Sequence, residues 1–222
     1  MKTVIKKLSS ILFLLIVIYI TGHAQTPDPI INYKGKINFL KGQKVFNVIY
    51  DYENMILADY ENEQSYINKE IIERNKLEAG LGEKWAEEWV AIRELRFQPK
   101  FENVFNTVLG KKGIEIGNYT NAPYTIIVKT IRMVPIGSIN VKIDLLLPPL
   151  ITMVSIIDIE ILFVPTNNIE NVLSKITMKK IYAEDNSGGD IGNGVAYRLQ
   201  KAYGFCGLFL AKYLKRKKFY KN

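Results

Sequence analysis

The second half of the chain alternates apolar and polar residues with the period of two that is typical of β-strands. Short segments at 135–138, 148–149 and 165–168 interrupt this alternation, and each is expected to break or turn the chain because it is rich in Pro, Gly or Asn. An earlier apolar segment supplies a first strand. The predicted strands are 44–52, 124–134, 139–147, 151–164 and 172–182. They indicate a mainly antiparallel sheet of about five strands.

Between residues 64 and 112 the apolar residues recur with a helical period instead. A first helix carries Tyr66 and Ile67 and ends at Gly80, a second begins at about Glu83, and a third begins at Pro99, which suits a first helical turn. A long C-terminal helix carries one apolar stripe, formed by Val195, Leu199, Ala202, Cys206, Phe209, Leu210 and Tyr213. The fold class predicted is therefore α+β, with helices packed on the sheet and a long C-terminal helix.

The first 24 residues have the pattern of a secretory signal peptide. Lys2, Lys6 and Lys7 precede an apolar segment at 11–20, and Gly22-His23-Ala24 places small residues before a cleavage site after Ala24. An uncleaved anchor is the alternative, and in both cases the rest of the chain is exported. We expect a lead-in at 25–43, one α+β domain at 44–214 with a helical insertion at 64–112, and a basic tail at 215–222.

The formal net charge of +8 comes from the two ends of the chain. Three cations lie in the predicted signal peptide. Six more lie among the last eleven residues, at Lys212, Lys215, Arg216, Lys217, Lys218 and Lys221. The part between carries a charge of −1, which argues against a nucleic-acid-binding groove lined with Lys and Arg.

Two scarce residue types exclude common catalytic groups. The single histidine, His23, lies in the predicted signal peptide, so the exported chain has no imidazole for a Ser-His-Asp or Cys-His site or for His-ligated zinc. The single cysteine, Cys206, cannot form an internal disulfide and is expected in the core. No cofactor or metal is predicted.

Carboxylates remain as candidate catalytic groups. Asp158 and Glu160 share one face of a strand, because residues two apart point the same way, and such a pair could serve as acid and base for glycan hydrolysis. The alternative is that they lie on the solvated face, opposite Lys175, Lys179 or Arg132. The glycine-rich segment 187–194 matches neither a P-loop nor a dinucleotide fingerprint. We therefore expect a connection in which Asp190 or Asn193 caps the following helix.

Two segments are candidate binding surfaces. Trp85 and Trp89 lie one helical turn apart, so they could stack on sugar rings, form a ridge for a partner, or belong to the core. The tail combines cations and aromatic rings at Lys215, Arg216, Lys217, Lys218, Phe219 and Tyr220. It suits an anionic envelope surface such as phospholipid headgroups, lipopolysaccharide phosphates or wall polymers; the alternative is a solvated terminus.

Over residues 44–214 the order of elements is strand, helices, antiparallel strands, glycine-rich loop and closing helix. This order resembles small α/β accessory proteins of the Gram-negative cell envelope, and the resemblance implies a binding role. The first hypothesis is an exported, non-catalytic protein of the periplasm or outer-membrane periphery, or a secreted one, that binds an envelope protein or an anionic envelope surface. The alternatives are a carboxylate-based hydrolase of envelope glycan and a carrier of a small apolar ligand. No span is expected in the exported chain, because Asp144, Pro148 and Pro149 interrupt its most apolar segment.

Overall fold

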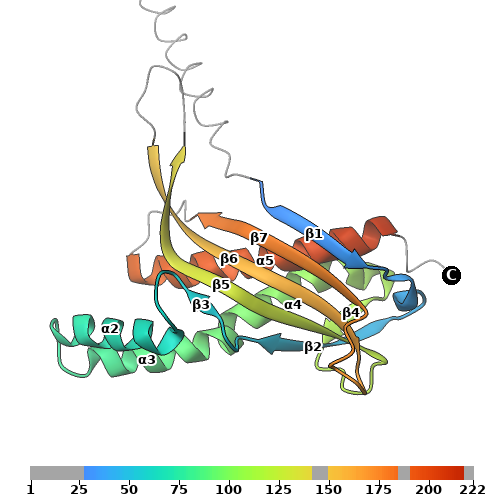
Figure 1. Ribbon diagram of the computed structural model, residues 1–222, viewed down its shortest axis with the longest axis horizontal. Helices are drawn as coiled ribbons and strands as arrows, with labels where there is room; N and C mark the ends of the chain where they lie inside the picture. The colour runs from blue at the N-terminus through green and yellow to red at the C-terminus, as the bar shows by residue number, and fades with distance from the viewer. Residues whose placement is uncertain (1–27, 142–149, 185–190, 218–222) are drawn as a thin grey trace, which may run out of the picture.

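The computed structural model describes residues 28–141, 150–184 and 191–217 (Figure 1). The predicted signal peptide and Lys218, Phe219 and Tyr220 of the tail lie outside the described residues. So do the predicted chain break at 148–149 and the candidate cap Asp190.

One sheet of seven strands organises the described chain, in the order β1-β7-β6-β5-β2-β4, with β3 beside β5. The strands are β1 (Ile30–Gly35), β2 (Val45–Asp51), β3 (Ile56–Leu57), β4 (Glu115–Gly117), β5 (Tyr124–Val141), β6 (Leu150–Pro165) and β7 (Ser174–Glu184). The neighbours β1, β7, β6 and β5 pair antiparallel, whereas β2 runs parallel to both β4 and β5, and β3 runs parallel to β5. The predicted α+β class with a mainly antiparallel sheet is confirmed.

The predicted turn at 135–138 is wrong. β5 continues through these residues as one strand, so the predicted strands 124–134 and 139–147 are not two separate strands. Its pairing with β6 shifts register between Val134 and Gly137, and the Ser155 hydroxyl donates a hydrogen bond to the Pro135 carbonyl. A bulge has no place for a ladder N–H at the extra residue, so a proline is accommodated there without breaking the strand.

Strand β1 was not predicted as a strand, only as part of an extended lead-in. It lies at the edge of the sheet, and all of its residues except Ile31 are exposed. Its backbone pairs with β7 in an unbroken antiparallel register from Ile30 to Gly35. An edge strand held mainly by backbone hydrogen bonds has no apolar alternation, so the sequence pattern cannot identify it.

The predicted helices are confirmed, with shifted ends. They are α2 (Glu63–Asn75), α3 (Leu81–Ile92), α4 (Gln98–Leu109) and α5 (Ile191–Lys217), with the short turns η1 (Asn38–Leu40), η2 (Arg93–Phe97) and η3 (Gly110–Lys112). The π-helical η2 joins α3 to α4, and Pro99 lies in the first turn of α4. Because α5 begins at Ile191, Asn193 lies inside the helix and the prediction that it caps the helix is wrong. The end of the glycine-rich segment is helical because packing of the later turns stabilises the whole helix.

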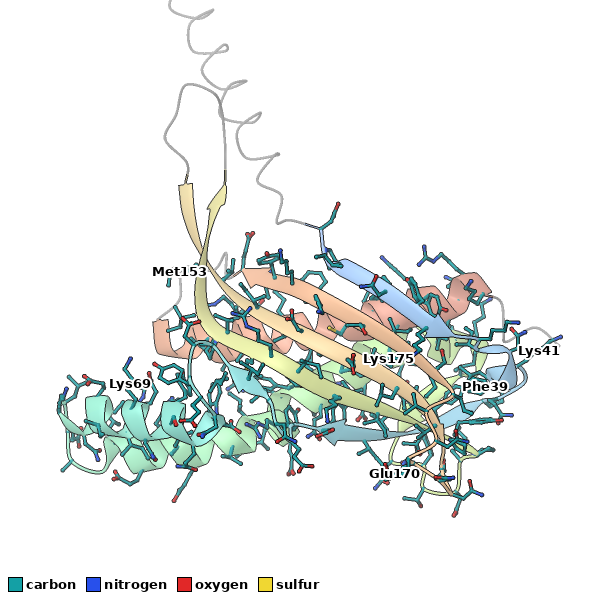
Figure 2. The ribbon with its side chains drawn as sticks, viewed as in Figure 1. Phe39, Lys41, Lys69, Met153, Glu170 and Lys175 are labelled. Atoms are coloured by element: carbon teal, nitrogen blue, oxygen red, sulfur yellow. The ribbon has the colours of Figure 1, made fainter. Side chains whose placement is uncertain are left out.

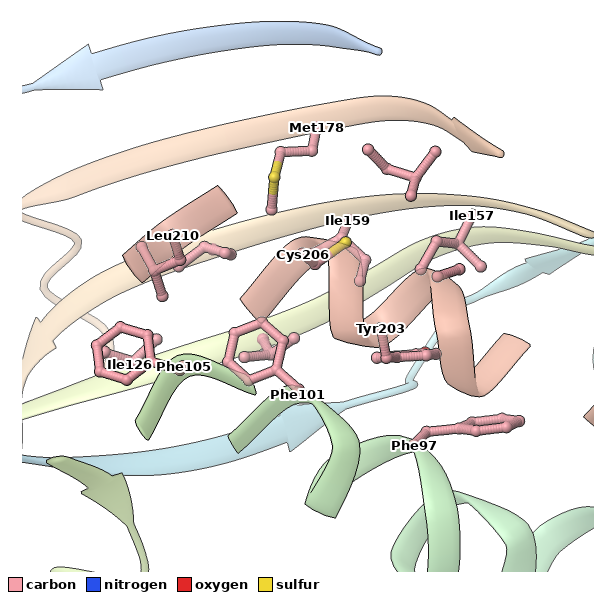
Figure 3. Packing of buried hydrophobic residues seen from close by; sticks show 14 of the residues in the cluster. Phe97, Phe101, Phe105, Ile126, Ile157, Ile159, Met178, Tyr203, Cys206 and Leu210 are labelled. Carbon is pink, nitrogen blue, oxygen red and sulfur yellow. The ribbon is translucent and has the colours of Figure 1, made fainter. Parts of the chain in front are cut away.

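Helices α4 and α5 cover one face of the sheet and enclose the core (Figures 1 and 3). The side chains of Phe101, Phe105, Leu210 and Ile159 are completely buried there. The two helices approach closely at Gly207, where an added Cβ would lie 2.3 Å from the Phe101 carbonyl oxygen.

Cys206 lies in this core, as predicted. Burial raises the pKa of its thiol, so the side chain stays neutral and behaves as a small apolar group.

Two parts of the molecule lie outside this packed core. The α2–α3 hairpin extends past the end of the sheet, at the opposite end of the long axis from the C-terminus (Figure 1). The other face of the sheet carries charged side chains, Lys175 among them (Figure 2). Within residues 28–141, 150–184 and 191–217, no helix combines the length and apolar character that crossing a bilayer requires.

Candidate partner-binding groove

A groove with a volume of about 570 Å³ lies between the α2–α3 hairpin, β5 and the beginning of α5. Apolar and aromatic side chains form most of its lining: Tyr66, Trp85, Trp89, Ala91, Ile92, Leu95, Ile136, Val195 and Ala196. Charged groups of both signs complete it: Glu70, Arg74, Glu88 and Arg96. The groove therefore has an apolar surface with charged groups of both signs around it.

An aromatic cluster forms one wall of the groove. The rings of Trp85 and Trp89 stack with centroids 5.5 Å apart, because a spacing of four residues places them on one helix face. Tyr66, from α2, meets both indole rings nearly edge-on at 5.8 and 5.4 Å. Burial raises the pKa of the Tyr66 hydroxyl, which keeps it neutral. The stacked pair thus joins α2 to α3.

Polar contacts fix the position of Trp89. Its indole N–H donates to Glu63 Oε1 at 2.8 Å, and Arg93 forms an ion pair with the same carboxylate. Only 6% of Trp89 is exposed. It is therefore a structural residue of the hairpin as well as part of the groove wall.

Trp85 is more exposed than Trp89, but other groups lie against its ring. Trp89 stacks on it, and the Arg74 guanidinium lies 4.7 Å from its centroid. Arg74 is also held by Glu70 at 3.0 Å. A sugar ring that stacked on Trp85 would therefore have to compete with Arg74, which makes this indole a poor open platform for a glycan.

Exposed apolar side chains complete the groove. Leu95 is 74% exposed and Ile136 is 49% exposed. They come from η2 and from the bulged part of β5, far apart in the sequence. The sequence pattern singled out Trp85 and Trp89 but missed Arg74, Ile136 and Val195, because only long-range packing brings these segments together.

The carboxylate pair lies elsewhere, on the charged face of the sheet. Glu160 Oε1 accepts a hydrogen bond from Lys175 Nζ at 2.7 Å and from Thr177 Oγ1 at 3.2 Å. Asp158 Oδ1 accepts one from the backbone N–H of Lys180 at 2.7 Å. The predicted solvated face and the partner Lys175 are confirmed. These contacts give both carboxylates a role in strand pairing, and their use as acid and base stays a prediction.

The residues before Ile159 and Glu160 explain the Asp158 contact. The β6–β7 register shifts between Ile157 and Ile159, and Lys180 has a positive φ of 57°. A bulge leaves a backbone N–H without a strand partner, so the Asp158 carboxylate takes that place. Among the described residues, no group of three or more His, Cys, Asp and Glu side chains has an arrangement that could hold a metal ion.

The basic tail lies far from the groove. Lys215, Arg216 and Lys217 are exposed in the last turn of α5. Nearby, Tyr213 stacks on Tyr33 of β1 at 4.7 Å, and Lys217 Nζ lies 5.7 Å from the Tyr213 centroid. The two candidate surfaces from the sequence are therefore separate, at opposite ends of the long axis (Figure 1).

No protein-family model matches this chain, and no curated protein matches it significantly. Two solved structures are similar to it in the arrangement of elements. One is a PelC dodecamer from Paraburkholderia phytofirmans, with 10% identity, a TM-score of 0.31, and coverage of 80% of this chain and 96% of that chain. The other is described as a neuraminyllactose-binding hemagglutinin homolog from Helicobacter pylori, with 15% identity, a TM-score of 0.38, and coverage of 89% and 95%. No residue role is transferred from either structure.

Proposed function

We propose that this chain is an exported, non-catalytic binding module of the cell envelope whose α2–α3 groove holds a segment of another envelope protein. The export part of the proposal rests on the signal-peptide pattern of residues 1–24. The binding part rests on one observation: a groove that exposes Leu95 and Ile136 beside a stacked tryptophan pair, outside the folding core.

The lining favours a protein segment over the other ligand classes. Tryptophan, tyrosine and arginine are the residues that dominate binding at protein interfaces, and Trp85, Tyr66 and Arg74 meet at this groove. Charges of both signs around an apolar surface suit a peptide that carries its own side chains of either sign. A glycan would need an uncovered ring face, and the Arg74 contact with Trp85 disfavours that.

Site-specific photo-cross-linking in the exporting cell tests this function. A photoreactive amino acid placed at Leu95 or at Ile136 is expected to capture the same envelope protein. The same group at Asn167, in the exposed turn after β6, is expected not to capture it. A groove partner should also disappear when Ala91→Trp fills the groove and remain with Asn167→Trp, which adds an equal ring elsewhere.

Circular dichroism of both tryptophan variants checks that the fold is retained. Capture that is equal at Asn167, or insensitive to Ala91→Trp, would remove the groove as the binding site. A co-purifying lipid in place of a protein would favour the carrier role, and glycan turnover lost with Glu160→Gln would favour the hydrolase.

A further inference from the structure

The outer side of α5 forms a second surface that differs in chemistry from the groove. Residues 191–222 contain no acidic residue and eight basic residues: Arg198, Lys201, Lys212, Lys215, Arg216, Lys217, Lys218 and Lys221. Within the described residues, Lys212, Lys215 and Arg216 are exposed. Cations near a helix C-terminus are also favoured by the helix dipole, so charge by itself does not define a binding surface.

An apolar groove adjoins these cations. Its volume is about 280 Å³, and it lies between α5, the end of β7 and the start of β1. Its apolar lining consists of Pro29, Ile181, Tyr182, Phe205, Leu208 and Phe209, and Lys212 stands at its border. Phe205 is 45% exposed, although the next residue, Cys206, is completely buried. The helix thus presents an aromatic ring outward where its inner face is already packed.

The aromatic and basic residues lie on one face of the helix. Phe205, Leu208, Phe209, Lys212, Lys215 and Arg216 are separated by three or four residues, or by multiples of one helical turn. At 1.5 Å per residue the face is about 16 Å long. It begins with apolar side chains and ends with cations.

We propose that this face of α5 docks the protein on an anionic phospholipid bilayer. The charge complementarity between the three cations and phosphate headgroups supplies the attraction, and Phe205 enters the boundary between headgroups and acyl chains. A soluble polyanion offers nothing to the exposed ring, and for that reason a bilayer fits this face better. The proposal rests on the envelope location proposed above but not on the α2–α3 groove. With the C-terminal end of α5 on the bilayer, the hairpin lies at the far end of the molecule (Figure 1).

Vesicle co-sedimentation with the exported protein tests this docking. Intact mass establishes whether residues 1–24 are present, and all variants are compared in the same form. Vesicles of equal parts phosphatidylglycerol and phosphatidylethanolamine should bind the protein, and vesicles of phosphatidylcholine should not. Removal of Lys212, Lys215 and Arg216 as glutamines should lower the partition coefficient about a hundredfold, from about fivefold for each cation.

Two matched variants separate a docking face from general charge. Lys44→Gln, Lys84→Gln and Lys111→Gln together remove the same charge from exposed positions elsewhere and should change binding less than about threefold. Phe205→Gln should lower vesicle binding about tenfold and leave retention on phosphocellulose unchanged, because only the bilayer receives the ring.

Three results would overturn the proposal: equal loss in both triple variants, no effect of Phe205→Gln on vesicle binding, or binding to lipopolysaccharide aggregates without binding to the phosphatidylglycerol vesicles. Ala91→Trp, which fills the α2–α3 groove, should leave vesicle binding intact. Failure of the groove and failure of the docking face are therefore distinguishable.

Discussion

The body of the molecule, meaning the sheet with α4 and α5, and the α2–α3 hairpin use their apolar residues differently. In the body, Phe101, Phe105 and Leu210 are completely buried between helices and sheet (Figure 3). In the hairpin, Leu77 is 80% exposed, and Leu95, just beyond α3, is exposed as well. Folding of the body accounts for its apolar residues, whereas the exposed ones at the hairpin contribute little to folding. The contrast therefore indicates which surface is available for binding.

Deleting the same side chain in each region gives the largest expected contrast. Leu210→Ala should lower the free energy of unfolding by about 3 kcal/mol, because it leaves a cavity among fully buried residues. Leu77→Ala, at an exposed position, should change it by less than about 0.5 kcal/mol. Urea unfolding followed by far-ultraviolet circular dichroism measures both. A loss for Leu77→Ala comparable to that for Leu210→Ala would mean that the hairpin surface is a folding surface after all.

Close helix contacts at glycine allow a smaller, sharper test. In the body, Gly207→Ala would place a Cβ 2.3 Å from the Phe101 carbonyl oxygen. The clash with backbone should cost about 2 kcal/mol of global stability by separating α4 from α5. Gly204→Ala is the matched control, since its nearest neighbours are the flexible Lys100 methylenes at 3.1 Å and beyond, and it should cost little.

The hairpin contains the same contact between α2 and α3. Gly82→Ala would place a Cβ 2.4 Å from the Ile71 carbonyl oxygen. Because Trp85 and Trp89 both lie in α3, this change should alter tryptophan fluorescence. The circular-dichroism transition of the body should shift less than it does for Gly207→Ala. Equal shifts for Gly82→Ala and Gly207→Ala would show that the two regions unfold as one unit.

The sequence predicted those parts of the body in which local pattern and burial agree. The alternation in β6 identified Ile157, Ile159 and Ile161 as the core face, and all three are completely buried. The helical stripe of α5 likewise placed Cys206 inside. In these elements, one face packs on the core and the other meets solvent, so the period of the side chains is visible in the sequence.

The errors arose where backbone geometry or long-range packing decides. Residues 135–138 contain proline and glycine, which are typical of turns, yet the strand continues through a bulge there. Strands β3 and β4 have two and three residues and are too short for a detectable period. The groove combines residues from α2, α3, β5 and α5, so no single segment of sequence contains its pattern.

The smallest expected effect concerns a half-buried carboxylate of the body. The Tyr50 hydroxyl, on β2, donates a hydrogen bond to Glu102 Oε1 on α4 at 3.0 Å. Burial raises the pKa of Glu102 above its ordinary value of 4.5, although the Tyr50 hydrogen bond acts in the opposite direction. Because the folded state binds this proton more tightly than the unfolded state, Glu102 favours folding below its ordinary pKa, and that contribution is lost as the pH rises through the folded-state pKa.

Glu102→Gln should therefore have little effect near pH 4 and stabilise the protein at neutral pH by less than about 1 kcal/mol. The Gln carbonyl can still accept the Tyr50 hydrogen bond, so the substitution removes the charge and keeps the contact. Glu87→Gln, on the exposed surface of α3, is the matched change in the hairpin and should leave stability nearly unchanged at both pH values. Urea unfolding at each pH measures the difference. If Glu102→Gln destabilises the protein at neutral pH, then the ionised carboxylate is favourable where it lies, and the body holds a charge at no net cost just as the hairpin does.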